Sequence, residues 1–319
     1  MRRIALVLAS TCALFATVAA PTHAGSNVDE RLEAVLAKTS GRSAVVALYR
    51  GRVIGTAGRD ADLYTPLHLA SVSKTVTAAA VMRLAERGDI DLSAPIGDYL
   101  RKFFADGNDE IAAQPVSAFL NHATGLRSNN LRAVTTGLTT WQKYAAQAGA
   151  GRVNATPGRY RYSNDNYVLL TKLVVEVTDT PFSVAVRDLV WKPLGVDGGR
   201  LDVATRATQV LGGSGAWVAS ARDVAVLFDA LNPDSPGPKL LSPRWLTRMH
   251  SIAYAADYRN GLRFRGDAWG HTGSLYAVRS AAVVTKSGTV YVSCPKVLDR
   301  ASRNVSSMHS HGWVDARLG

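Results

Sequence analysis

Ser71 and Lys74 are the first residues whose types and spacing could do chemistry. They open the stretch HLASVSKTVTAAAVMRLAERGDI, residues 68–90, whose apolar positions repeat with a helical period until Gly88. Residues three apart share one helix face, and a partly desolvated lysine can take the proton that makes a serine hydroxyl nucleophilic. The pair therefore predicts acyl-transfer chemistry, unless Ser71 only caps the helix and Lys74 is a surface residue.

Spacing alone does not single out this pair. Ser293 and Lys296 have the same separation, but Pro295 lies between them at the end of a predicted strand, so we interpret that pair as accidental. Ser73, beside the first pair, is expected to be a polar residue facing the cleft.

Tyr162 and Asn164 form a second candidate, in PGRYRYSNDNYVLL, just before another apolar stretch of helical type. A phenol can relay a proton when nearby cations lower its pKa, and an amide can orient a substrate carbonyl. The alternative for Tyr162 is a buried aromatic ring with a hydrogen-bonded hydroxyl. Tyr258 and Asn260 repeat the spacing but lead into a predicted strand, so no role is assigned to them.

His271, Thr272 and Gly273 form a third candidate at the head of a predicted strand in WGHTGSLYAVRSAAVV. A glycine lets a substrate approach the backbone closely, and the next amide, that of Ser274, could help to hold an oxyanion. A structural histidine at the start of a strand is the alternative.

The order of the three motifs resembles that of the serine β-lactamase and penicillin-binding protein family: S-x-x-K on a helix, Y-x-N in a helical middle region, then H-T-G on a late strand. The similarity extends to residues 69–100, to FLNHATGL at 119–126 and to GSGAWVASARDVAVLFDAL at 213–231, so it covers roughly residues 30–290. The resemblance implies an acyl-enzyme on Ser71, with Lys74 and Tyr162 sharing the acid and base work. It assigns substrate positioning to Asn164, His271, Thr272 and Gly273, an oxyanion site to the amides of Ser71 and Ser274, and no cofactor or metal.

Two positions qualify the substrate that the resemblance implies. Where class C β-lactamases mostly carry lysine, this chain has His271, as is typical of secreted actinomycete-type D-alanyl-D-alanine carboxypeptidases and of some family esterases and D-aminopeptidases. Arg263 stands where those carboxypeptidases bind the substrate carboxylate, although a solvated strand arginine is an equal alternative; Arg279 is a weaker candidate. Ala277 replaces a frequent glycine, which puts substrate preference in doubt.

We therefore expect a D-alanyl-D-alanine carboxypeptidase acting on peptidoglycan stem peptides. A class C-like β-lactamase or a small-ester esterase is the alternative within the same chemistry, with a β-lactam or an ester as substrate. From another class comes a catalytically silent penicillin- or wall-binding protein. Intact Ser71, Lys74, Tyr162 and His271 argue against that reading.

The fold expected is α/β, β-lactamase/transpeptidase-like, with an antiparallel sheet flanked by helices and an inserted all-α domain. Residues 25–90 and 211–319 would form the α/β domain, residues 91–210 the helical insertion, and the active site would lie between them. Within the first domain, SAVVALYRGRVIGTAG predicts a hairpin around Arg50-Gly51.

Residues 1–24 have two arginines, an apolar run and a small-residue end, which predicts a signal peptide and a secreted or extracytoplasmic protein. Removing them leaves 35 basic against 25 acidic side chains, dispersed along the chain, so nucleic acid is a poor partner.

The sequence contains only two cysteines, Cys12 and Cys294, so we expect the mature chain to have no internal disulfide and no zinc-type cysteine pattern. His309 and His311, without nearby carboxylates, are interpreted as solvated and His122 as structural. We expect a monomer without a membrane anchor beyond the signal peptide.

Overall fold

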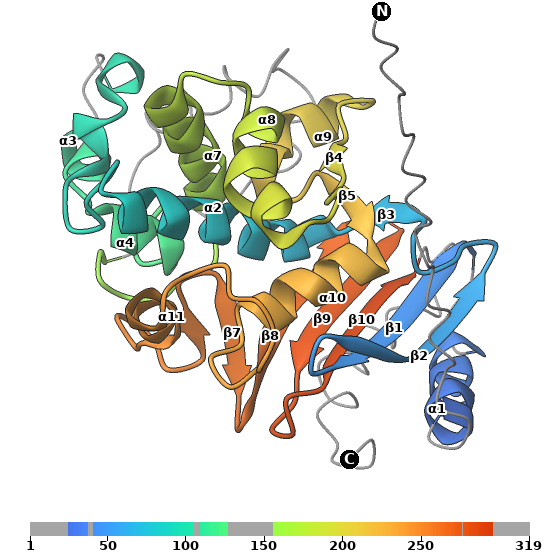
Figure 1. Cartoon of the computed structure of the whole chain (residues 1–319). Helices are drawn as coiled ribbons and strands as arrows, with labels where there is room; N and C mark the ends of the chain where they lie inside the picture. The colour runs from blue at the N-terminus through green and yellow to red at the C-terminus, as the bar shows by residue number, and fades with distance from the viewer. Residues whose placement is uncertain (1–24, 38–40, 105–108, 127–155, 276, 296–319) are drawn as a thin grey trace, which may run out of the picture.

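The computed structural model describes residues 25–37, 41–104, 109–126, 156–275 and 277–295. At its centre is a seven-stranded sheet whose neighbouring strands all run antiparallel, in the order β2-β1-β10-β9-β8-β7-β6 (Figure 1). Its strands are β1 (Ser43–Tyr49), β2 (Arg52–Arg59), β6 (Tyr258–Arg259), β7 (Leu262–Arg265), β8 (Ala268–Leu275), β9 (Val278–Val284) and β10 (Val290–Pro295). The expected antiparallel sheet is confirmed, and β1 and β2 meet at Arg50-Gly51 as the hairpin pattern predicted.

Helices cover both faces of this sheet. Helix α1 (Gly25–Ala37) packs on the outer face of β1 and β2, where Leu32 and Leu36 bury their side chains. Helix α10 (Ala221–Ala230) crosses β1, β10 and β9 on the opposite face (Figure 1). Alternate residues of β1 enter two different cores: Val46 and Leu48 lie in the larger one, and Val45 and Ala47 lie in the smaller one beneath α1.

Helix α2 (Ser73–Arg87) runs through the larger core and begins directly after the one-turn 3-10 helix η1 (Ala70–Val72). Residues 73–82 of α2 are all buried, as expected for a helix that has neighbours on every side. The helix ends at Gly88, whose φ of 81° is the left-handed conformation that glycine adopts at helix ends. The N-terminal turn of α2 therefore sits deep in the molecule, while its C-terminal turn reaches the surface.

The middle of the chain supplies most of the remaining helices, some of which pack on α2 away from the large sheet (Figure 1). They are α3 (Asp109–Ala112), α4 (Val116–Leu120), α7 (Asn164–Thr178), α8 (Phe182–Val186) and α9 (Arg206–Leu211), with α11 (Pro243–His250) following later in the chain. Short turns of helix occupy η2 (Ile96–Asp98), η3 (Arg101–Phe103), η4 (Arg187–Trp191), η5 (Lys192–Leu194) and η6 (Gly212–Ser214).

A second, three-stranded sheet joins the helical region to the rest. Strand β5 (Trp217–Ser220) pairs with β3 (Pro66–His68) on one side and with β4 (Arg200–Leu201) on the other. The described residues between 91 and 210 thus contain one short strand, β4, besides their helices, while the proposed domain boundaries stay a prediction. In the part of the chain that the structure describes, no helix is long and apolar enough to cross a membrane.

Candidate active site

Ser71 lies in the tight turn η1, at the point where the chain passes from the small sheet into α2. Ala70, just before it, has a φ of 43°, a left-handed conformation that costs a residue other than glycine about 1 kcal/mol. The turn is held by the Leu69 N–H, which donates to Trp217 O (2.9 Å), and by Ser280 Oγ, which donates to Leu69 O (2.5 Å). Ser71 itself is only half-buried, so the surrounding contacts fix a hydroxyl that solvent can still reach.

The structure brings Ser71, Lys74 and Tyr162 into direct contact. Tyr162 Oη donates to Ser71 Oγ at 2.9 Å, and Lys74 Nζ donates to the same oxygen at 3.3 Å. Lys74 Nζ also lies 5.0 Å from the centroid of the Tyr162 ring. The serine hydroxyl therefore has two neighbours that can exchange a proton with it, one from the same helix and one from 91 residues further along the chain.

Lys74 is fully buried, and two further acceptors hold its ammonium group. Nζ donates to Asn164 Oδ1 (2.6 Å) and to the carbonyl oxygen of Ser214 (2.5 Å). Asn164 is the first residue of α7, and Ser214 ends η6. Gly213 lets η6 reach α2, because a Cβ there would lie 2.4 Å from Thr77 Oγ1. Asn164, predicted to position the substrate, thus contacts the lysine, and the Ser214 carbonyl joins the site without any side-chain signal in the sequence.

The surroundings shift both proton-exchanging groups toward their deprotonated forms. Burial lowers the pKa of Lys74, and the charge of Arg263 acts in the same direction. Burial alone would raise the pKa of Tyr162, but the charge of Lys74 and the hydrogen bonds to Lys74 and Ser71 lower it overall. A deprotonated partner can accept the Ser71 proton, so the cluster has the electrostatics that an activated serine needs.

His271 lies behind the site and not at its surface. The ring is 1% exposed, its Nδ1–H donates to Thr272 O (2.7 Å), and its Nε2 accepts from Tyr258 Oη (3.3 Å). Burial, together with the charges of Arg263 and Lys74, lowers the pKa of His271 well below its ordinary value. The imidazole is therefore neutral at pH 7, and both of its nitrogen atoms are engaged within the protein.

The rest of the H-T-G motif lines up beside the nucleophile on β8. Gly273 packs against the turn that carries Ser71, since a Cβ there would lie 2.4 Å from Leu69 O. Strand β7 pairs with β8 only as far as Gly270, so beyond it β8 is paired on the β9 side alone among the described strands. Thr272 is half-buried and Ser274 exposed along this stretch. An extended substrate could bind against that edge.

Arg263 supplies a positive charge next to the hydroxyl cluster. Its guanidinium carbon lies 5.1 Å from the centroid of the Tyr162 ring and 5.7 Å from that of Tyr258, and the residue is exposed. Arg279, the weaker candidate, lies on β9 and donates to Val278 O (2.8 Å). Ala277 is half-buried and lines a separate cavity with Leu275 and Cys294.

An aromatic cluster beneath the site includes residues that the sequence did not indicate. The ring of His122 lies between tyrosines, with centroid distances of 4.4 Å to Tyr162, 4.8 Å to Tyr258 and 5.1 Å to Tyr167. His122 Nδ1 accepts from the Ser163 N–H (3.3 Å), so a neutral ring carries its proton on Nε2. That buried nitrogen has no partner among the described residues. Tyr258, given no role from sequence, is part of this cluster and contacts His271.

One expectation was wrong, and several others fall outside the description. Ser73 does not face the cleft: it is fully buried, and its Oγ accepts from the Trp217 N–H (3.0 Å), because the first turn of α2 packs directly on β5. Ser293 is fully buried on β10. Lys296, His309 and His311, like the predicted signal peptide at residues 1–24, lie outside the described residues. No cluster of three or more metal-ligating side chains occurs within the described ranges.

Comparison with known proteins agrees with this geometry. A family model described as Beta-lactamase matches residues 28–294. The chain belongs to the Beta-lactamase family. Its fold and its serine hydrolase class follow from that membership, which covers amidohydrolases, esterases and penicillin-binding proteins.

Individual relatives of this Beta-lactamase family member are distant. The putative penicillin-binding protein PbpX of Bacillus subtilis (strain 168) is 24% identical over 132 residues, 41% of this chain and 32% of PbpX. The esterase/beta-lactamase LipL of Mycobacterium tuberculosis (strain ATCC 25618 / H37Rv) is 26% identical over 151 residues, 44% of this chain and 33% of LipL. The chain thus aligns with about a third of either curated relative.

Among solved structures, a D-stereospecific amidohydrolase from Streptomyces sp. is similar over 90% of this chain and 99% of its own, with a TM-score of 0.67 and 22% identity. That likeness shows the common fold.

Proposed function

We propose that this chain is an exported serine hydrolase that removes the terminal residue from peptides ending in D-alanyl-D-alanine. The observation that carries the proposal is the hydroxyl cluster of Ser71, Lys74 and Tyr162 with the exposed Arg263 guanidinium beside it. A terminal carboxylate needs a fixed cation, and the buried, neutral His271 does not supply one. The D-stereospecificity in the name of the similar amidohydrolase supports a substrate with D-residues.

The reaction divides into two acyl transfers. Ser71 Oγ attacks the peptide carbonyl while its proton passes to Lys74 or Tyr162, and the amides of Ser71 and Ser274 hold the resulting oxyanion. The C–N bond then breaks, and the leaving D-alanine amine takes up that proton. Water next attacks the Ser71 ester, the same two residues accept its proton, and the proton returns to Ser71 as the ester bond breaks.

Two cationic groups have different tasks in this scheme. Lys74 is buried and held by Asn164 and Ser214, so it stays with the nucleophile. Arg263 is exposed and can form a bidentate contact with the free carboxylate of the substrate. Export follows from the leader-like residues 1–24, and N-terminal sequencing of protein collected outside the producing cells tests it.

The experiment compares wild type with Ser71→Ala and Ser293→Ala. The second variant removes a buried hydroxyl from the other S-x-x-K and is the matched control. We expect wild type and Ser293→Ala to bind a fluorescent penicillin covalently and to release D-alanine from a diacyl-L-Lys-D-Ala-D-Ala peptide. Ser71→Ala should do neither. Equal peptide and ester hydrolysis by wild type and Ser71→Ala would show that the acyl-enzyme mechanism is wrong.

Arg263→Gln separates the peptidase from the alternatives. It should lower kcat/KM for the peptide by about 10-fold to 100-fold, the loss typical of one charged hydrogen-bonded contact, and leave hydrolysis of an uncharged nitrophenyl ester within about threefold. Rapid turnover of the penicillin would instead favour a β-lactamase. Preference for esters with no effect of Arg263→Gln would favour an esterase, as the name of LipL suggests.

A further inference from the structure

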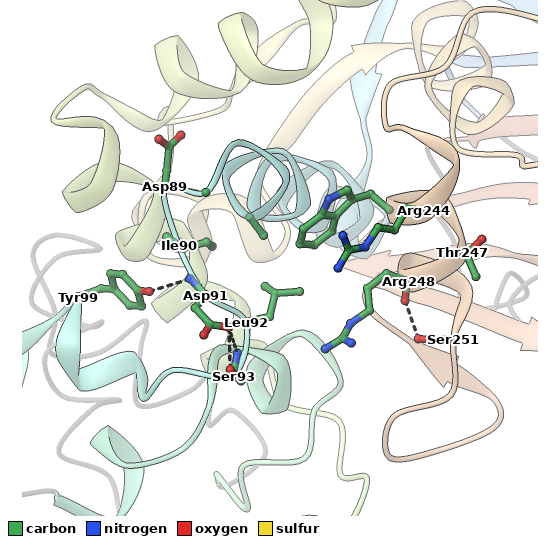
Figure 2. A pocket seen from close by; sticks show the side chains of 13 residues that line it. Asp89, Ile90, Asp91, Leu92, Ser93, Tyr99, Arg244, Thr247, Arg248 and Ser251 are labelled. Carbon is green, nitrogen blue, oxygen red and sulfur yellow. Dashed lines mark hydrogen bonds between the residues drawn. The ribbon is translucent and has the colours of Figure 1, made fainter.

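A second cavity, of about 970 Å³, opens at the far end of α2 from the nucleophile. Its walls are the loop after α2, residues 88–93, and helix α11, with Tyr99 at one side (Figure 2). Ala85, which lines it, is 14 residues beyond Ser71, so the cavity lies roughly 20 Å along the helix from the serine. It is therefore separate from the hydroxyl cluster.

Two arginines direct their charges into this cavity. Arg244 and Arg248 are one helical turn apart on α11, and both are exposed. Figure 2 shows both guanidinium groups turned toward the loop of residues 88–93, whereas Thr247 of the same helix points away. Neither guanidinium has an acidic partner within 4.0 Å among the described residues. Both can therefore bind an incoming anion.

The two carboxylates of the cavity wall are already engaged. Asp89 pairs with Arg87 at 2.9 Å, and in Figure 2 it points away from the cavity. Asp91 Oδ1 accepts from the N–H (2.8 Å) and the hydroxyl (2.7 Å) of Ser93. The bonds with Ser93 and, to a smaller extent, the charge of Arg248 lower the pKa of Asp91. Two arginines that face one such carboxylate leave a net positive charge on the α11 side, where an anion would bind.

The remaining wall is aromatic and apolar. Trp245, between the arginines in sequence, is half-buried against the core, and Ile90 and Leu92 are buried beneath the loop. Tyr99 is half-buried, and its hydroxyl accepts a hydrogen bond from the Asp91 N–H at 2.8 Å, which fixes the position of the ring in the wall. A ring or another apolar body could lie against these side chains while its acid group meets the guanidinium groups.

The walls are fixed before any ligand arrives. Helix α11 is tied to the end of α2 by the Ser242 N–H, which donates to Glu86 Oε1 at 2.7 Å. The loop is tied to α4 by the Ser117 N–H, which donates to Leu92 O at 2.9 Å. A preformed cavity with a few convergent polar groups binds at a lower entropy cost than one that must be assembled.

We propose that this cavity is a binding site for an organic anion, whose carboxylate or phosphate binds Arg244 and Arg248 and whose ring lies against Trp245 and Tyr99. The acid can be a free small molecule or a repeating unit of an acidic polysaccharide, since both present the same chemistry. The site is independent of the reaction proposed for Ser71.

The test uses phenyl phosphate as the probe, with inorganic phosphate for the charge alone, followed by calorimetry and tryptophan fluorescence. Wild type should bind phenyl phosphate saturably and about tenfold more tightly than inorganic phosphate, because the ring buries apolar surface. Arg244→Gln and Arg248→Gln should each weaken binding about tenfold, while Arg52→Gln, at an exposed arginine on β2, should not change it. Trp245→Phe should abolish the fluorescence change and keep the calorimetric signal.

Galacturonic acid and polygalacturonic acid, compared at equal carboxylate concentration, distinguish the two sources: tighter binding of the polymer identifies a polysaccharide ligand, and equal binding a free acid. The proposal is overturned if wild type shows no saturable binding of phenyl phosphate, or if Arg244→Gln and Arg248→Gln bind it as tightly as wild type. Circular dichroism establishes that the variants are folded.

Discussion

The chain contains two Y-x-N motifs, Tyr162-Ser163-Asn164 and Tyr258-Arg259-Asn260. Their tyrosine rings lie in the same aromatic cluster around His122, yet the two motifs belong to different elements. The first enters a helix: Ser163 caps α7 by accepting from the Asp165 N–H at 3.2 Å, and Asn164 begins the helix. The second enters a hairpin: β6 ends at Arg259, and Asn260 and Gly261 form the two-residue turn to β7, with φ of 43° and 90°.

The element decides where each asparagine points. At the start of α7, Asn164 faces Lys74 and accepts a hydrogen bond from its Nζ at 2.6 Å. In the β6–β7 turn, Asn260 exchanges two hydrogen bonds with Asn121, both of 2.9 Å, and donates to the carbonyl oxygens of Arg248 and Met249. The second asparagine thus joins three segments of the chain and does not approach the serine. Identical spacing thus accompanies a proposed catalytic role in one case and a structural role in the other.

Replacing each tyrosine with phenylalanine tests this comparison with the largest expected effect. Tyr162→Phe removes the hydroxyl that contacts Ser71 Oγ, so the rate of acylation by a fluorescent penicillin should fall about 10²-fold to 10⁴-fold. Tyr258→Phe removes a hydroxyl that contacts His271 Nε2 (3.3 Å) and Tyr167 Oη (3.5 Å), and the rate should stay within about tenfold of wild type.

Stopped-flow labelling measures both rates, and near-ultraviolet circular dichroism checks that each variant keeps its packing. A loss in Tyr258→Phe as large as that in Tyr162→Phe would break the comparison, because it would place the second tyrosine in the reaction.

Replacing the two asparagines should have the opposite pattern: the variant of the second motif should lose stability, and the variant of the first should lose activity. Asn260→Ala loses the side-chain bonds to Asn121, Arg248 and Met249 and puts alanine at a positive φ, so the free energy of unfolding should fall by about 2–4 kcal/mol. Asn260→Gly keeps the turn conformation and should recover about 1 kcal/mol of that loss.

Urea unfolding measures these differences. Asn164→Ala is the matched variant: we expect a large loss of activity with a change in stability below about 1 kcal/mol, because a buried Lys74 can lose its proton when an acceptor is removed. Equal destabilisation by Asn164→Ala and Asn260→Ala would contradict the assignment.

Local sequence signals predict part of the fold and part of the difference between the two Y-x-N motifs. The α2 helix, its stop at Gly88 and the β1–β2 hairpin were predictable, because periodicity and glycine punctuation are local signals. The antiparallel sheet was expected from the family resemblance and not from these local signals. The Asn260-Gly261 dipeptide is also a strong hairpin signal, and it would have separated the two Y-x-N copies.

Other features depend on contacts between distant segments and have no local signal. The burial of His271 arises where β8 meets Tyr258, and the capture of Lys74 by Ser214 uses a backbone carbonyl. Ser73 was misplaced for the same reason, since its partner is a backbone amide 144 residues away. The motif order indicated the candidate residues of the site, but only the packing of η6 and α7 on α2, with the hydrogen bond from β5 to Ser73, defines their partners.

The residue after each asparagine also differs: Asp165 follows Asn164, and Gly261 follows Asn260. Asp165 gives the comparison its most specific test, a dependence of stability on pH. Burial raises its pKa from an ordinary 3.8 to about 7, although the charge of Lys74 opposes the shift. The folded protein therefore binds more protons than the unfolded chain between these values. The stability that Asp165 contributes is complete below pH 3.8 and is lost as the pH rises through 7.

Asp165→Asn should remove that dependence. Between pH 4 and pH 8 the free energy of unfolding of wild type should fall, relative to the variant, by an amount on the order of 4 kcal/mol. The carboxylate also raises the pKa of Lys74, so its removal should move the rising limb of the pH–rate profile to lower pH. Asp257→Asn, at an exposed residue just before the second tyrosine, should change neither curve. Parallel pH curves for wild type and Asp165→Asn would mean that the carboxyl titrates alike in the folded and unfolded chain, and that only Lys74 and Tyr162 set the protonation of the site.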